Sequence, residues 1–430
     1  MEAAAIHLRA RTYVALLLLA AGVAIVIALA TLAFLGAYSA LRDLLWQELP
    51  QELGVDPFSW YALAVTTAGG LVVGVLLAVV PGHGGPSPAH GHGIGMESVP
   101  ASHTAGMVLV SLVSLSAGAS LGPEAALLAV ALAVGGLLAE RLRRAELSRV
   151  FGMSGVGSLL SGLFGSPLGP AALVLEVTKV TGRNLYVFLV PVLVASSVGL
   201  LAFEAILNGP LMDIALPAYA GADPLDVLAA LLVGAVAAGA GMVIVVAHRT
   251  VRLLLRPVRE RTVLTAALSG LGIGLVALAA GEETLFSGEH ELEVLLESPE
   301  AYGAGALLLI LGGKIVAFAI SLETGFRGGR IFPVLFTGAT VGFLASDLFD
   351  RVPLAVSVAC GMAGAAVAIM RLPVFVAVMV AFFAAPATVP LIVLACVVGY
   401  VLTFDRPELG GPAPEDERTA TAEDLEPGPS

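Results

Sequence analysis

The stretch SGVGSLLSGLFGSPLGPAALVLE (residues 154–176) is apolar over nearly its whole length, yet glycine and proline interrupt it repeatedly. A second stretch, CGMAGAAVAIMRLPVFVAVMVAF (residues 360–382), has a similar layout. Gly155 precedes Pro167 by 12 residues, and Gly361 precedes Pro373 by the same 12 residues, so the two stretches lie 206 residues apart. This spacing predicts an internal repeat, with halves over about residues 10–208 and 220–404.

The composition places these halves in a membrane. Of the 430 residues, 58% are hydrophobic and only 13% are charged, whereas about a quarter of the residues in a soluble protein are charged. Six apolar runs are long enough to cross a bilayer as helices: residues 13–35, 60–80, 185–207, 227–247, 262–280 and 302–320. We therefore expect an all-α polytopic membrane protein whose transport domain covers residues 1–404.

Membrane proteins built from two such halves often place them in opposite orientations, with discontinuous helices that meet near the midplane. Three glycine-containing loops are candidates for those helix starts: PGHGGP (81–86), SLGPEA (120–125) and RGGRIFP (327–333). Free N–H groups at a helix N-terminus bind anions without a fixed cation. The offset of 206 residues aligns Gly122 with Gly328 and Glu124 with Arg330.

Glu124 is an acid at the start of an apolar run, and a carboxylate inside a membrane is costly unless it is used. We interpret it as a tethered anion that occupies the same amide-lined site as a permeating ion and leaves when protonated or displaced. The alternative is a structural glutamate that caps a helix or forms an ion pair.

Charge sets the expected orientation. Arg9, Arg11 and the connection HRTVRLLLRPVRER (248–261) are basic, so the positive-inside rule places them and both termini in the cytoplasm, with the protein in the inner (plasma) membrane. Residues 281–300 hold seven acids and no Lys or Arg, so they lie outside. The acidic tail 405–430 is expected to be disordered. Neither of these two acidic stretches is a basic patch, so we expect no nucleic-acid partner.

The glycine loops resemble the signatures of the CLC family of chloride channels and proton–chloride exchangers. The family's Gly-Ser-Gly-Ile-Pro is similar to GHGGP (82–86), its Gly-Lys/Arg-Glu-Gly-Pro to GPEAA (122–126), and its Gly-x-Phe-x-Pro to GRIFP (329–333). The resemblance implies a homodimer with one chloride pathway per subunit and Glu124 as the gate. The anion-binding residues that it implies are Gly82, His83, Gly84, Gly85, Gly122, Arg330, Ile331 and Phe332.

Departures from the family pattern bear on the mechanism. His83 replaces the serine that faces the anion, Pro123 replaces a basic residue, and Ile331 takes the Phe position. Val177 stands where exchangers usually have a proton-transferring acid, and Glu176 is one position, or about 100° of helix, away. Valine favours a channel or passive transporter, with a proton-coupled chloride antiporter as the alternative. The nearest candidate for the family's pore tyrosine is Tyr400.

Other candidate residues leave alternatives open. Lys314 lies within an apolar run and either adds positive charge to the pore or extends to the membrane surface. Four histidines within residues 83–103 leave a metal site as an alternative, but we expect neither a metal nor a cofactor. A membrane-embedded enzyme is a lower alternative, because we find no aspartyl pair, Ser/His dyad or metal motif on facing spans.

Overall fold

The computed structural model describes residues 10–85, 101–178, 180–207, 214, 216–221 and 223–409. Within these residues the chain is helical, and the only strand-like pairing is an antiparallel bridge between Gly122 and Gly329. Nine helical stretches of the described chain are long and apolar enough to span a membrane. They include all six expected spans, and the additional three are Ala145–Phe164, Ile331–Leu348 and Pro386–Thr403. The prediction of an all-α polytopic membrane protein is confirmed.

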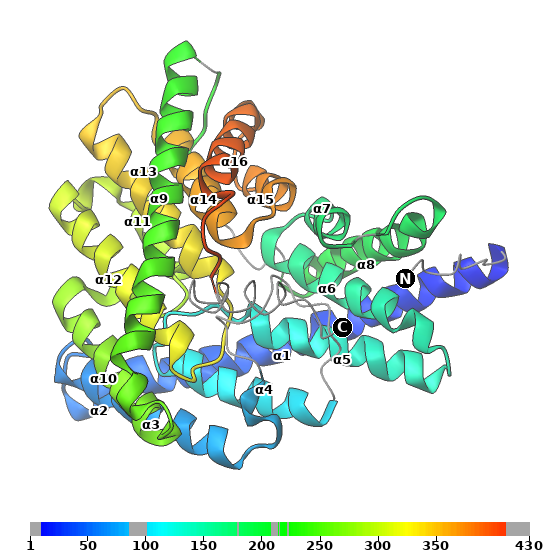
Figure 1. Cartoon of the computed structure of the whole chain (residues 1–430), viewed down its shortest axis with the longest axis horizontal. Helices are drawn as coiled ribbons and strands as arrows, with labels where there is room; N and C mark the ends of the chain where they lie inside the picture. Colours follow the sequence, from blue (N-terminus) through cyan, green and yellow to red (C-terminus); the bar gives the residue numbers. More distant parts are fainter. Residues whose placement is uncertain are drawn as a thin grey trace, which may run out of the picture.

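The chain forms two successive series of helices (Figure 1). The first series is α1 (Ala10–Asp43), α2 (Leu49–Leu53), α3 (Trp60–Val79), α4 (Ala101–Ser116), α5 (Glu124–Arg141), α6 (Ser148–Phe164), α7 (Leu168–Val177) and α8 (Arg183–Leu207). The second is α9 (Pro224–Leu254), α10 (Thr262–Ala280), α11 (Glu289–Glu297), α12 (Ala304–Glu323), α13 (Ile331–Leu348), α14 (Leu354–Met370), α15 (Pro373–Ala381) and α16 (Val389–Thr403).

The second series repeats the packing of the first. In the first series α6 packs against α5, α1 and α8, and in the second α14 packs against α13, α9 and α16. Helices α5 and α13 both have 18 residues, and α6 and α14 both have 17. Across the two series α3 packs against α10, and α7 lies beside α15 (Figure 1). The repeat predicted from the sequence is therefore present in the helix packing.

The two repeated stretches, residues 154–176 and 360–382, both contain a helix break. Helix α6 ends at Gly165 in the left-handed conformation, and α7 begins just after Pro167. Helix α14 ends at Arg371, also left-handed, and α15 begins at Pro373. Proline is tolerated in the first turn of a helix because it lacks the N–H that would be unpaired there. The matching Gly–Pro spacing in the sequence thus marks matching pairs of short helices.

Glycine lets the paired helices approach closely in both series. A Cβ atom at Gly135 of α5 would lie 2.2 Å from the backbone N of Gly152 on α6. A Cβ atom at Gly338 of α13 would lie 2.3 Å from the backbone O of Gly361 on α14. Small residues at such crossings bring helix backbones into contact within a membrane. These two crossings hold α5 against α6 and α13 against α14, and the candidate site lies where α5 and α13 begin.

Candidate anion site at the start of two helices

Glu124 is the first residue of α5 and is buried, with 1% of its surface exposed. Its side chain reaches across to α13, where the backbone N–H of Ile331 donates to Glu124 Oε1 at 2.6 Å. The N–H groups of Phe332 and of Glu124 itself also stabilise the carboxylate. The second oxygen, Oε2, is buried without a hydrogen-bond partner. The N-termini of α5 and α13 therefore converge on one buried carboxyl group.

The two helix starts are held together by a short backbone bridge. Gly122 N donates to Gly329 O at 2.9 Å, and Gly329 N donates to Gly122 O at 2.5 Å. A Cβ atom at Gly329 would lie 1.9 Å from Glu124 Cδ, and one at Gly122 would lie 2.0 Å from Glu124 Oε2. Only glycine at these two positions leaves room for the carboxylate between the helix ends.

The geometry corrects the register of the repeat at this point. The sequence offset of 206 residues aligned Glu124 with Arg330, but α13 begins at Ile331, 207 residues after Glu124. The N–H that binds Glu124 therefore belongs to the residue that holds the equivalent position in the other series. Arg330 immediately precedes α13 and is partly buried, and its charge interacts with Glu124 and Glu408.

The glycine loop at residues 81–86 differs from the two loops that precede α5 and α13. Residues Pro81–Gly84 form a single 3-10 turn, and residues 86–100, which include His90 and His92, lie outside the described chain. The side chain of His83 also lies outside the described part. The loop contacts the segment before α13 through a carbonyl group, since Gly84 O accepts a hydrogen bond from Arg327 Nε at 2.9 Å.

Arg327 was missed by the sequence reasoning, which singled out Arg330 instead. Its backbone N donates to Ser114 Oγ at 3.1 Å and its side chain donates to Gly84 O. It also donates to the carbonyl groups of Gly325 and Phe326. Arg327 thus joins the loop before α13 to the loop before α4. Its position within RGGRIFP was the available signal, because that motif places two arginines beside the glycines.

Lys314 is fully buried, but the structure assigns it specific partners away from Glu124. Its Nζ donates to the carbonyl groups of Leu285 at 2.7 Å, Phe286 at 3.0 Å and Glu283 at 3.1 Å. It also lies 4.8 Å from the centre of the Phe336 ring. Three hydrogen bonds match the three donors of an ammonium group. They account for its burial, so extension to the membrane surface is wrong for this residue.

Glu176 is held on α15 rather than left free. Its Oε1 accepts from Val374 N at 2.9 Å and its Oε2 accepts from Phe375 N at 2.8 Å, both in the first turn of α15. A carboxylate at a helix N-terminus is stabilised by the unpaired N–H groups and the helix dipole. Val177, the next residue, is partly buried. Tyr400 on α16 packs its ring 5.7 Å from that of Phe404.

Among the described residues no group of three or more His, Cys, Asp or Glu side chains is arranged to hold a metal ion. The chemistry available at Glu124 is electrostatic. Backbone N–H groups at two helix starts favour a negative charge, and the low dielectric of a buried site excludes a second anion at the same position. In the structure the Glu124 carboxylate occupies this position.

The fold is that of an all-helical polytopic membrane protein in which the starts of two helices meet at one buried carboxyl group. The family model for voltage gated chloride channels matches residues 69–403. The chain belongs to that family, and it is a CLC-family anion transporter.

Similar proteins agree with this assignment. The chain is 30% identical over 374 residues to the "Putative ion-transport protein YfeO" of Escherichia fergusonii, a match that covers 85% of this chain and 87% of the relative. A slow cyanobacterial Cl⁻/H⁺ antiporter matches in structure with a TM-score of 0.76 and 17% identity, covering 97% of this chain and 100% of that one. A CLC-type fluoride/proton antiporter matches with a TM-score of 0.71 and 15% identity, covering 92% and 97%. These structures share the fold.

Proposed function

We propose that the protein conducts chloride or another small anion passively, and that the Glu124 carboxylate is the gate. The observation that carries the proposal is the hydrogen bond from Ile331 N to Glu124 Oε1. A carboxylate that accepts from a helix N-terminus occupies the position in which a free anion would be bound. When Glu124 is protonated it loses its negative charge, and the amide groups then favour the free anion.

Passive transport is supported by the surroundings of Val177. Valine carries no proton, and both oxygens of the neighbouring Glu176 accept hydrogen bonds from the start of α15. A carboxylate whose two oxygens are both held by backbone N–H groups is not free to carry protons along the pathway. Val177 and Glu176 therefore offer no relay that would pass protons to Glu124.

A proton-coupled chloride antiporter is the second candidate. It is favoured by the structural likeness to a Cl⁻/H⁺ antiporter and a fluoride/proton antiporter. Under either mechanism we propose a homodimer in the inner (plasma) membrane, with one pathway per subunit. Both termini and the basic connection 248–261 are then cytoplasmic, and residues 281–300 lie outside.

The experiment that separates the two mechanisms is chloride efflux from liposomes that contain the purified protein. Internal chloride is trapped, and external pH is recorded with valinomycin and potassium present, with and without a proton ionophore. Passive transport predicts efflux whose rate does not depend on the ionophore and no uphill proton movement. Proton uptake at a fixed ratio to chloride efflux would reject the passive mechanism and favour the antiporter.

A further inference from the structure

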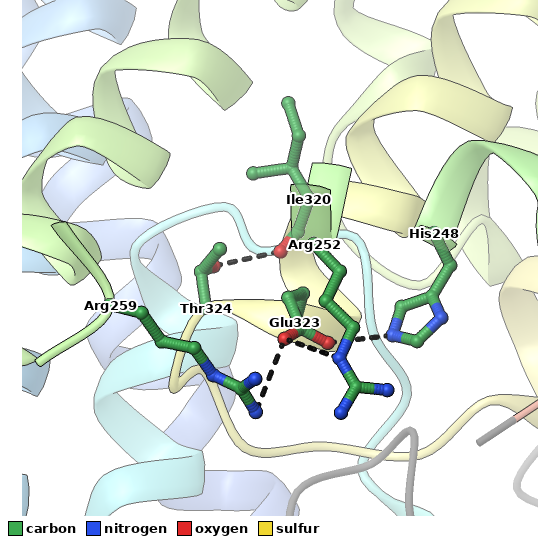
Figure 2. Close-up of polar contacts among 6 residues, drawn as sticks. All are labelled: His248, Arg252, Arg259, Ile320, Glu323 and Thr324. Atoms are coloured by element: carbon green, nitrogen blue, oxygen red, sulfur yellow. Dashed lines mark hydrogen bonds and ion pairs between the residues drawn. The ribbon is translucent and has the colours of Figure 1, made fainter. Parts of the chain in front are cut away.

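The end of α12 carries a buried glutamate, Glu323, that is surrounded by three basic side chains (Figure 2). His248 Nε2 lies 2.9 Å from Glu323 Oε2, Arg259 Nη2 lies 3.6 Å from Oε1, and Arg252 Nε lies 3.8 Å from Oε1. The side chains of Glu323 and His248 are 4% and 2% exposed. We call these four residues the Glu323 cluster.

Glu323 is in an unfavourable place for a lone carboxylate. It is the last residue of α12, where the helix dipole disfavours negative charge. It is also buried, and a buried charge is costly unless it is paired. Both costs are offset by His248 and Arg252 on α9 and by Arg259 in the connection after it. The cluster therefore joins α9 and that connection to the end of α12.

The chain that leaves Glu323 leads directly to the anion site. Seven residues separate Glu323 from Ile331, and the structure holds them at several points. Thr324 Oγ1 donates back to Ile320 O at 2.7 Å. The Arg327 side chain donates to Gly84 O, and its backbone N–H donates to Ser114 Oγ. Gly329 is then bridged to Gly122.

We propose that Glu323 is a positioning residue of the anion site. By holding the end of α12 on the basic connection, the Glu323 cluster sets where the N–H of Ile331 lies relative to Glu124. The inference rests on the proposed function, because it assigns Glu323 a role at the same site. When glutamine replaces Glu323, the side chain is neutral and no longer forms ion pairs with the two arginines. The segment 324–330 then keeps its contacts at Thr324, Arg327 and Gly329 but loses its charged anchor on the basic connection.

The test compares Glu323→Gln with a matched control in the same protein. Asp226→Asn is suitable, because Asp226 is a buried carboxylate at the other end of α9 that accepts from Tyr219 and from Asp223 N. Bromide binding to the purified full-length protein is measured by isothermal titration, with and without Glu124→Ala. We expect Glu323→Gln to weaken bromide binding about threefold to thirtyfold in both backgrounds, and Asp226→Asn to change it by less than about twofold.

A second variant guards against misfolding of Glu323→Gln. Arg252→Gln and Arg259→Gln together remove the two positive charges next to Glu323. The two side chains are 33% and 51% exposed, respectively, so their replacement leaves no cavity in the protein core. We expect weaker bromide binding here as well. Unchanged binding in the double arginine variant, or equal loss in Glu323→Gln and Asp226→Asn, would overturn the proposal.

Failure of the proposed function gives a different result. If Glu124 is not the gate, Glu124→Ala and wild type carry the same anion flux at every pH, whatever Glu323→Gln does to bromide binding. If only the positioning role is wrong, Glu124→Ala alters flux while Glu323→Gln leaves bromide binding unchanged.

Discussion

The backbone N–H of Ile331 lies 2.6 Å from the Glu124 carboxylate, although 207 residues separate the two in the sequence. Each of these residues is the first of an 18-residue helix, and the two helices hold equivalent places in the two series. The contact between the two series of helices is thus also the contact that holds the Glu124 carboxylate. A change on either side of it alters the surroundings of that carboxylate.

Gly329→Ala should displace the gate without touching Glu124. The added Cβ atom would lie 1.9 Å from Glu124 Cδ, so the carboxylate must leave the Ile331 N–H. We expect anion flux in liposomes to lose most of its dependence on pH. Gly312→Ala on α12 is the control, since a Cβ atom there meets nothing within 4 Å. A wild-type pH profile in Gly329→Ala would count against the geometry of the site.

Lys314→Met should destabilise the protein rather than alter its selectivity. The substitution leaves the carbonyl groups of Glu283, Leu285 and Phe286 without their donor, and each buried unpaired group costs about 1–3 kcal/mol. We expect a lower midpoint of thermal unfolding in detergent, with a loss of about 3 kcal/mol or more. Arg144→Gln, which breaks an exposed pair, is the control and should change stability by less than about 0.5 kcal/mol. Equal midpoints for the two variants would contradict this role.

Glu289 should make stability depend on pH. Burial, and then the charges of Glu293 and Glu291, raise the pKa of this carboxyl group from 4.5 to about 8. The folded state therefore binds the proton more tightly than the unfolded state, so the stabilisation is complete below about pH 4.5 and is lost as pH rises to about 8.

Glu289→Gln should flatten the fall in unfolding midpoint between those two pH values. The matched control is Glu300→Gln, at an exposed acid in the same acidic stretch. If wild type and Glu289→Gln lose the same stability over this range, the group does not titrate as the structure indicates.

Much of the fold could be predicted because it depends on long apolar runs and on repeated Gly–Pro breaks. Helix α6 was not predicted as a span, since its glycines and serines face other helices and lower its apolar character. The repeat was predicted from Gly155, Pro167, Gly361 and Pro373. One residue of register was lost between these landmarks and the start of α13, because loop length is not set by helix periodicity.

The site could be predicted only in part. Glu124 and the RGGRIFP loop are marked by charge and glycine within apolar sequence, and the structure brings them together. The roles of Arg327, Glu323 and His248 depend on contacts between residues far apart in the sequence, such as His248 with Glu323 and Arg327 with Gly84, which no local pattern encodes. The three carbonyl groups that bind Lys314 could not be predicted from the sequence either, since every residue carries a backbone carbonyl group.

The central claim is that the Glu124 carboxylate competes with the permeating anion, and Glu124→Gln tests it most directly. Glutamine keeps the size of the side chain but carries no charge at any pH, so it competes poorly for the Ile331 N–H. The measurement is anion flux from liposomes with purified wild type and Glu124→Gln between pH 4 and 8. We expect the variant to be faster at neutral pH and nearly independent of pH, while wild type accelerates as pH falls. Equal flux from the two proteins across the whole range would contradict the account.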